Sequence, residues 1–184
     1  MKKLFKNPQF DSYKQLKEFV LSPYCKWTHI KESIPPDGDD APSEDSEYKN
    51  TDFYAHSFLA RPRDDVKRYP TVEDSEFIDL VSTALCDIML YNGFCIRSFY
   101  RICANATHPF DKIYSTVPHQ DHSYEHGNVI LYLTDAGGKT FVENGNDSYE
   151  YHDPREDDVF LFSGNHYNET PKDKRRVIIV ATFI

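Results

Sequence analysis

The sequence lacks the features of membrane-spanning, secreted and strongly basic proteins. Its longest apolar run, residues 177–184, is far shorter than the roughly 20 residues that a membrane helix needs. The N-terminus contains only a broken apolar stretch, so we expect no secretory signal. Lys and Arg number 21 against 30 Asp and Glu, and the net charge of −9 argues against a surface that neutralises phosphates. We therefore expect a soluble protein with no membrane partner, and nucleic acid is a disfavoured partner.

The sequence also lacks any C-x-x-C pair. Its four cysteines are Cys25, Cys86, Cys95 and Cys103, and most lie within apolar patterns. In a domain of this size, such cysteines indicate reduced, buried thiols rather than a disulfide framework or a zinc site. This favours a cytoplasmic location. Aromatic residues make up 15% of the chain, which suits β structure around a lined pocket and equally suits a well-packed core.

A short helix and an acidic loop are expected near the N-terminus. Ser12 and Gln15 match a capping box at the start of the helix, and Pro23 marks its end. Residues 34–50 hold three prolines and six acidic residues with little to bury. This composition predicts a mobile, solvated loop, and a lid over a site is the alternative.

A longer helix is predicted over residues 71–92. Its apolar residues recur at spacings of three and four, which places them on one face that packs against a sheet. We expect Thr71 and Asp74 to cap its start, and Asn92 and Gly93 to close its end.

Short strands separated by turn residues follow Gly93. They are predicted over residues 94–102, 112–117, 128–134, 139–143, 148–152, 158–162 and 175–183. Short strands after two helices indicate an antiparallel sandwich or barrel with the helices on one outer face. We expect a single domain spanning residues 1–184, in which residues 1–92 form a helical support and residues 93–184 form the β core.

Metal-capable side chains concentrate around His119 and Asp121. Residues two apart on an extended segment point the same way, so these two share a face while Gln120 points away. A third ligand would complete the two-histidine, one-carboxylate set typical of non-haem Fe(II) oxygenases. We favour His166, which directly follows an apolar strand, over His152, which opens a polar run and is expected to be exposed. Alone, the H-x-D spacing is common, and a surface His and Asp are the alternative.

The order of motifs over residues 101–184 resembles that of the Fe(II)/2-oxoglutarate-dependent dioxygenases, within their prolyl-4-hydroxylase-like branch of small bacterial and phage-type members. The matching features, in chain order, are the strand and turn at 101–105, His119 and Asp121, the apolar strand with Tyr132 followed by Gly137 and Gly138, the strand before His166, and Arg175 and Arg176 at the last strand. The sequence departs from the family at Thr134, which replaces an asparagine, and at Lys139, which replaces an acid.

The resemblance implies a mainly β fold, a double-stranded β-helix (jelly roll) with N-terminal helices packed on one outer face. It implies that His119, Asp121 and His166 are the catalytic residues that bind Fe(II), and that O2 and 2-oxoglutarate are co-substrates. Ascorbate is left open as a further cofactor. The reaction would hydroxylate an unactivated C–H bond with succinate and CO2 as co-products. A phage-encoded member would work in the host cytoplasm.

Arg176 and Tyr132 are implied to bind the far carboxylate of 2-oxoglutarate. Arginine suits this task because its planar fork grips a carboxylate at two points and keeps its charge. Arg176 shares its strand face with Thr182, where family members often carry a polar residue. Arg175 is the alternative anchor, but its face is entirely apolar and suits packing against the helices.

The implied substrate is a peptidyl proline or another protein side chain, with a free amino acid or small metabolite as the second choice. Selectivity is expected from residues 53–69, from the acidic loop, and from the segment after the H-x-D motif that carries His122, Tyr124 and His126; a polar loop without substrate contact is equally open. A non-catalytic jelly-roll module that binds a metal or ligand is the alternative function. A zinc hydrolase ranks last, since it would not need Tyr132 and Arg176.

Overall fold

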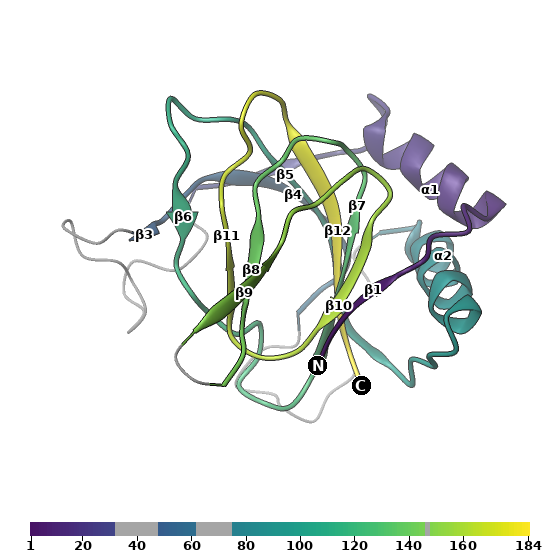
Figure 1. The fold of residues 1–184 in the computed structure, drawn as a ribbon. Helices are drawn as coiled ribbons and strands as arrows, with labels where there is room; N and C mark the ends of the chain where they lie inside the picture. The colour runs from purple at the N-terminus through teal and green to yellow at the C-terminus, as the bar shows by residue number, and fades with distance from the viewer. Residues whose placement is uncertain (32–47, 62–74, 146–147) are drawn as a thin grey trace.

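The computed structural model describes residues 1–31, 48–61, 75–145 and 148–184, and Figure 1 shows how their strands and helices are arranged. The main sheet is antiparallel and has seven strands. Their spatial order is β1 (Lys2–Phe5), β10 (Val159–Phe162), β7 (Gly127–Tyr132), β12 (Arg176–Phe183), β5 (Phe99–Thr107), β4 (Phe53–Leu59) and β2 (Thr28–Ile30).

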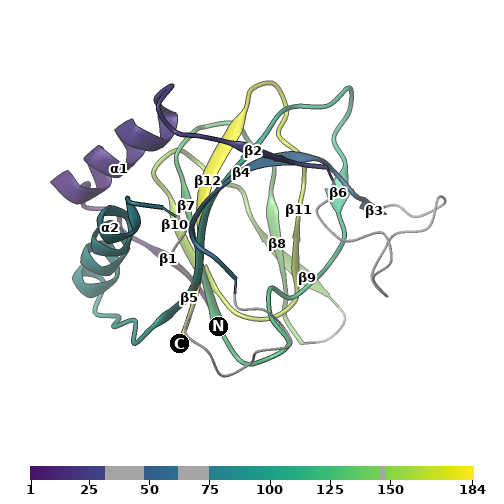
Figure 2. The ribbon, with the colours of Figure 1, turned by 180° about the vertical axis from the view of Figure 1, so that it is seen from behind.

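A smaller antiparallel sheet faces the main sheet and closes the barrel. Its order is β11 (His166–Asn168), β8 (Thr140–Glu143) and β9 (Tyr149–His152). A short parallel pair joins β3 (Tyr48–Lys49) to β6 (Ser115–Thr116) beside it. Figure 2 shows from behind how β5, β4 and β2 extend the main sheet past the smaller one. This two-sheet architecture is the predicted jelly roll.

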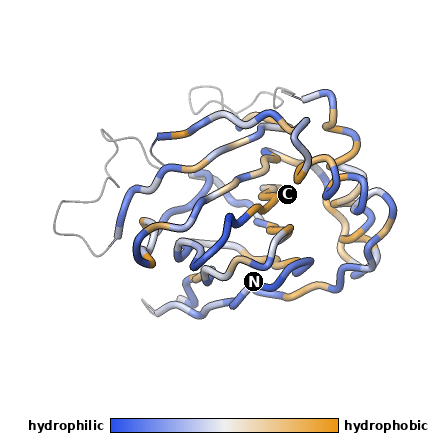
Figure 3. Tube along the Cα trace, turned by 90° about the horizontal axis from the view of Figure 1, so that it is seen from above, coloured by the Kyte–Doolittle hydropathy of each residue, from blue (hydrophilic) through white to orange (hydrophobic). Residues whose placement is uncertain are grey.

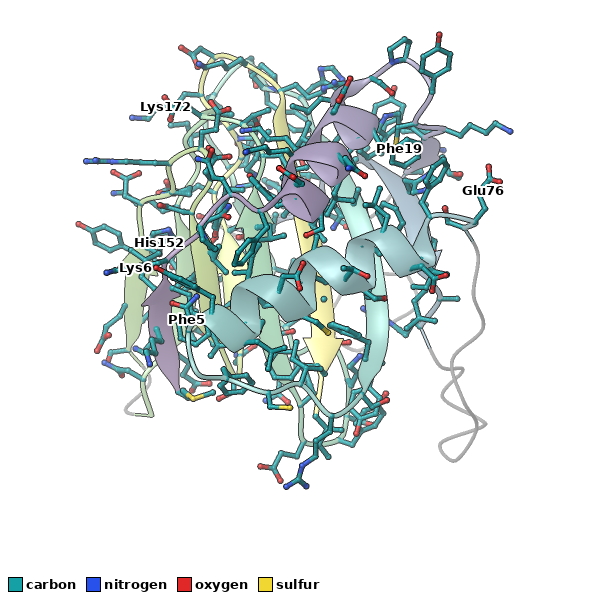
Figure 4. The ribbon with its side chains drawn as sticks, turned by 90° about the vertical axis from the view of Figure 1, so that its right-hand side faces the viewer. Phe5, Lys6, Phe19, Glu76, His152 and Lys172 are labelled. Atoms are coloured by element: carbon teal, nitrogen blue, oxygen red, sulfur yellow. The ribbon has the colours of Figure 1, made fainter. Side chains whose placement is uncertain are left out.

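Two helices, α1 (Asp11–Leu21) and α2 (Ile78–Tyr91), lie across the outer face of the main sheet (Figure 4). In α1 the buried residues are Tyr13, Leu16 and Val20, which recur at spacings of three and four and so form one face. Seen from above, apolar segments gather in the middle of the molecule and along the helices, while hydrophilic segments follow the outer loops (Figure 3).

Strand β12 separates two hydrophobic clusters because its side chains alternate between the faces of the main sheet. Its residues Val177, Ile179, Ala181 and Phe183 pack in the cluster that contains the helices. Its residues Ile178 and Val180 belong to a second cluster inside the barrel, with Cys103, Ile130, Tyr132, Val142, Phe160 and Phe162. The barrel interior is therefore lined by alternate residues of β5, β7, β10 and β12.

The predicted capping box of the first helix is wrong. Ser12 lies within α1, whose N-cap is Phe10, and the Ser12 hydroxyl donates a hydrogen bond of 2.7 Å to Asp87 on α2. The Ser12 hydroxyl, which the local pattern assigned to the helix cap, therefore forms a hydrogen bond between the two helices instead. The helix ends at Leu21, shortly before Pro23, as predicted.

The second helix begins later than predicted, at Ile78, and Thr71 and Asp74 lie outside the described residues. Its predicted end is confirmed. Asn92 is the C-cap, its side chain donates to the Ile88 carbonyl, and Gly93 takes a positive φ of 71°.

The predicted strands are confirmed with shifted bounds, the largest for β5, which starts at Phe99 rather than at residue 94. Most of the acidic loop lies outside the described residues, but Tyr48 and Lys49 form β3 instead of loop. The segment 1–92 is more than a helical support, because β1, β2 and β4 all join the main sheet. Among the described residues, no helix is long and apolar enough to cross a membrane.

Candidate metal and cosubstrate site

His119 and His166 lie side by side on two extended segments inside the barrel. Their backbones exchange two hydrogen bonds, of 2.9 and 3.0 Å, and their ring centroids are 4.7 Å apart. His166 is buried, and it begins β11 opposite Val142 of β8. The smaller sheet therefore holds His166 against the H-x-D segment.

Both rings are oriented by a backbone carbonyl. Nδ1 of His119 lies 2.8 Å from the Val117 oxygen, and Nδ1 of His166 lies 3.2 Å from the Gly164 oxygen. Because a carbonyl only accepts, Nδ1 carries the proton and Nε2 keeps its lone pair. Burial, with the neighbouring His119, lowers the pKa of His166 to about 4, so this ring is neutral at pH 7. Two Nε2 atoms are thus available as metal ligands.

Asp121 supplies the third donor group. Its Oδ2 lies 3.6 Å from Nε2 of His166, while its Oδ1 accepts hydrogen bonds from Arg101 Nη1 at 3.0 Å and Arg61 Nη2 at 3.1 Å. Burial acts to raise the pKa of Asp121, but the positive charge of Arg101 and its neighbours holds that pKa far below its usual range. The buried side chain is therefore a carboxylate at neutral pH.

The structure brings His119, Asp121 and His166 together as neighbours. In the described part of the chain, no group of three His, Cys, Asp or Glu side chains is already arranged around one metal position. Oδ1 of Asp121 is turned toward the arginines, and its Oδ2 faces His166. Two imidazoles and one carboxylate are nevertheless the donor set that Fe(II) takes in non-haem oxygenases, so these residues fit that metal.

His152 is not exposed, contrary to the sequence-based expectation. Its ring stacks on Phe160 with centroids 4.7 Å apart, and its Nε2 lies 3.1 Å from an oxygen of Asp158. It lies on β9, across from Thr140, and packs beside Tyr132 rather than beside His119.

Arg176 lies at the other end of the barrel interior and is 5% exposed. Its Nη1 donates to the carbonyls of Gly138 and Glu169, at 3.3 and 2.9 Å. Its Nε–H is buried and has no partner among the described residues. A buried N–H without an acceptor indicates a missing partner, and a ligand carboxylate would supply one.

Tyr132 lies on the same inner face, opposite Ile178 of β12. Its hydroxyl is 2.7 Å from that of Thr140, which in turn donates to Asn168 at 2.7 Å. Burial raises the pKa of Tyr132 to about 12, so the hydroxyl keeps its proton. The pair of Arg176 and Tyr132 therefore presents a cation and a hydroxyl to the same interior. Arg175, in contrast, is exposed.

The Gly-Gly turn after β7 makes room for Arg176. Gly138 has a φ of 83°, and a Cβ there would lie 2.8 Å from Nη1 of Arg176 and 2.8 Å from the Glu169 oxygen. A side chain at this position would collide with the guanidinium and with the backbone that anchors it. The glycine is therefore needed for both its backbone conformation and its size.

The segment after the H-x-D motif closes one end of the barrel. His122 is buried, with Nε2 at 2.8 Å from the Thr182 hydroxyl, and its ring stacks on Tyr124. Burial, with the charge of Arg61, lowers the pKa of His122 to about 4. A cavity of about 670 Å³ opens beside this segment, and Gln120, His126 and Gly164 are among its lining residues. This is the segment expected to border the site.

Sequence reasoning missed the two arginines on Asp121. In the sequence, Arg101 was noted only as the start of the segment that resembles the family. The signal that could have identified it is a charged residue at an inward position of a strand. Arg61 falls within the segment 53–69 that was expected to set selectivity; the part of this segment at residues 62–69 lies outside the described residues. In the sequence, Arg61 lies 60 positions and Arg101 lies 20 positions before Asp121, so no local pattern reveals that they meet there.

No family model matches the sequence, and the comparison with curated proteins finds no match. Solved structures with a similar fold exist. An oxidoreductase of the 2OG-Fe(II) oxygenase family from Burkholderia pseudomallei superposes with a TM-score of 0.67, at 14% identity, over 95% of this chain and 80% of that chain. The non-haem α-ketoglutarate-dependent epimerase SnoN from nogalamycin biosynthesis gives a TM-score of 0.58, at 10% identity, over 100% of this chain and 77% of that one.

At these identities the similarity concerns the fold, and the fold is the one that the sequence predicted. This structure itself shows the helices on the outer face, the two-sheet barrel and the inward histidines, and these observations do not depend on the comparison with solved structures. The protein has the jelly-roll fold of the 2-oxoglutarate- and Fe(II)-dependent oxygenases.

Proposed function

We propose that the protein is an Fe(II)- and 2-oxoglutarate-dependent dioxygenase that hydroxylates an unactivated C–H bond and releases succinate and CO2. His119, Asp121 and His166 would bind Fe(II). Arg176, with Tyr132, would bind the far carboxylate of 2-oxoglutarate. The single observation that carries the proposal is that one barrel interior holds both donor sets, two imidazoles beside a carboxylate and a buried guanidinium whose Nε–H has no partner among the described residues.

Each of these residues has a defined task in this proposal. The Nδ1 hydrogen bonds to backbone carbonyls fix the two imidazoles, so that Nε2 faces the metal position. Arg101 and Arg61 keep Asp121 ionised and occupy one of its oxygens. Bound Fe(II), together with 2-oxoglutarate, supplies the activation of O2 that the protein's own side chains cannot provide. The apolar residues Ile130 and Val180 between the two ends exclude water.

The substrate and the exact outcome are part of the proposal. The sequence resemblance favours a peptidyl proline or another protein side chain, with a free amino acid or small metabolite as the second choice. One neighbour with this fold is an epimerase. The same fold therefore serves more than one outcome, and the reaction has to be decided by the site.

Binding of 2-oxoglutarate to the Mn(II)-loaded protein tests the proposal, with calorimetry as the readout. Arg176→Met should weaken the affinity by about tenfold to a hundredfold, the range for losing a hydrogen-bonded charged partner. Arg175→Met is the matched control, because this neighbouring arginine is exposed and should leave the affinity unchanged. Equal losses in both variants, or no 2-oxoglutarate binding to the wild-type protein, would overturn the assignment. Tight binding without turnover would favour the non-catalytic module.

A further inference from the structure

Arg101 belongs to a polar row that crosses the inner face of the main sheet at the end that holds Asp121. In the strand register, Arg101 of β5 lies opposite Thr182 of β12, and Thr182 lies opposite Asn128 of β7. The next row inward consists of Cys103, Val180 and Ile130, which are apolar or weakly polar and buried. The polar row therefore lies directly beside the proposed metal position and on the barrel's inner face.

Arg101 uses little of its hydrogen-bonding capacity. A guanidinium carries five N–H donors. In the described part of the chain Arg101 makes one hydrogen bond, from Nη1 to Asp121, and its side chain is only 18% exposed. The remaining donors are held in a partly enclosed space, and their fork geometry matches a carboxylate.

Asn128, in the same row, is also incompletely satisfied. It is fully buried, and neither its amide nitrogen nor its amide oxygen has a partner among the described residues. Buried amides are nearly always hydrogen-bonded, so this row has the character of a site that lacks its ligand.

The charges at this end of the barrel are unbalanced once the cofactors are counted. At this end the two positive charges of Fe(II) would be balanced by one carboxylate of 2-oxoglutarate and by Asp121, since the other carboxylate is assigned to Arg176 at the far end. Asp121 must then serve the metal as well as Arg101. Positive charge beside the metal therefore remains available for a further anion, on a chain whose net charge is −9.

We propose that Arg101, with Asn128 in the same row, binds the carboxylate of the prime substrate. This rests on the proposed function and narrows it. The substrate would be a molecule that carries a carboxylate, such as a free amino acid, rather than a neutral peptidyl proline. Arg101 would hold that carboxylate so that a C–H bond of the same molecule lies near the metal.

The test uses the wild-type protein loaded with Mn(II) and 2-oxoglutarate, and calorimetric titration with pairs of probes. Each pair consists of a free L-amino acid and its carboxamide, and N-acetyl-L-prolinamide represents a neutral peptidyl proline. At least one acid should bind about tenfold or more tightly than its carboxamide, the effect of about one charge-assisted hydrogen bond. Arg101→Gln should abolish this preference. Arg97→Gln, at an exposed position just before the same strand, should keep it.

Several results would overturn the inference. They are the absence of any preference for acids, tightest binding of N-acetyl-L-prolinamide, or an Arg101→Gln variant that keeps the preference and instead loses affinity for 2-oxoglutarate. If Arg101→Gln does not fold, Arg101→Lys keeps the charge without the planar fork, and it should show a weakened preference for the acid. An unchanged preference in that variant would also refute the inference. The proposed function fails separately, at the loading step, if 2-oxoglutarate does not bind.

Discussion

Alanine at Gly138 should destabilise the protein by about 2–5 kcal/mol and weaken 2-oxoglutarate binding. The backbone contribution comes from a φ of 83°, which costs a residue with a Cβ about 1–2 kcal/mol. The contact contribution comes from the two atoms at 2.8 Å, Nη1 of Arg176 and the Glu169 carbonyl oxygen. Relieving such overpacking costs about 1–3 kcal/mol. The guanidinium can move, but the backbone oxygen cannot move without disturbing the turn.

Gly93→Ala is the matched control. Gly93 has a similar φ of 71°, yet a Cβ there would meet nothing within 4 Å. It should therefore show only the backbone cost of about 1–2 kcal/mol. Urea denaturation of both variants measures the difference, and thermal melting should show about 2–4 °C per kcal/mol for a chain of this size. Equal destabilisation of the two variants, or unchanged 2-oxoglutarate affinity in Gly138→Ala, would refute the argument that this glycine makes room for Arg176.

Three further predictions concern the site and the helix layer. Thr140→Val removes the hydroxyl that links Tyr132 to the smaller sheet, and should cost about 1–2 kcal/mol in urea denaturation and weaken 2-oxoglutarate binding in calorimetry. The pKa of His166 is lowered to about 4, so the unfolded chain takes up this proton at a higher pH than the folded protein does. The metal-free protein should therefore lose up to about 3 kcal/mol of folding free energy as the pH falls from 6.5 to 4. His166→Gln should flatten this pH dependence, and an unchanged slope would contradict the assignment. Ser12→Ala should cost about 1 kcal/mol through the lost bond to Asp87, against the near-zero effect expected if Ser12 were an unpaired surface residue.

The parts of the fold that could be predicted are those with strong periodic patterns. The last strand alternates two apolar faces, which is why Arg176 could be assigned to one face and Arg175 to the other before the structure was known. The apolar face of the second helix was equally readable, and its end at Asn92 and Gly93 followed from local chemistry.

Two of the missed strands, β1 and β11, carry weak patterns. β1 contains two lysines and lies at the sheet edge, and β11 has only three residues, one of them His166. Such segments become strands because a partner strand is available, not because of their own propensity. The capping box predicted at Ser12 also failed because of a tertiary contact, since the Ser12 hydroxyl donates a hydrogen bond to Asp87 on α2.

The proximity of the candidate site residues was predictable, but their surroundings were not. His119, Asp121 and His166 could be named from spacing and order, and the structure brings them together. The arginines that hold Asp121 could not be named, because each reaches it from a distant segment. The partial burial of His152 likewise involves stacking against Phe160, a contact between a strand of the smaller sheet and a strand of the main sheet.

Succinate formation in the absence of a prime substrate tests the central claim most directly. The protein is loaded with Fe(II) and 2-oxoglutarate without oxygen, air is admitted, and succinate is measured over time. The account predicts slow succinate formation in the wild-type protein, its loss in His119→Ala and Arg176→Met, and its retention in Arg175→Met. Succinate formation that survives in His119→Ala, or is lost equally in Arg175→Met and Arg176→Met, would contradict the account.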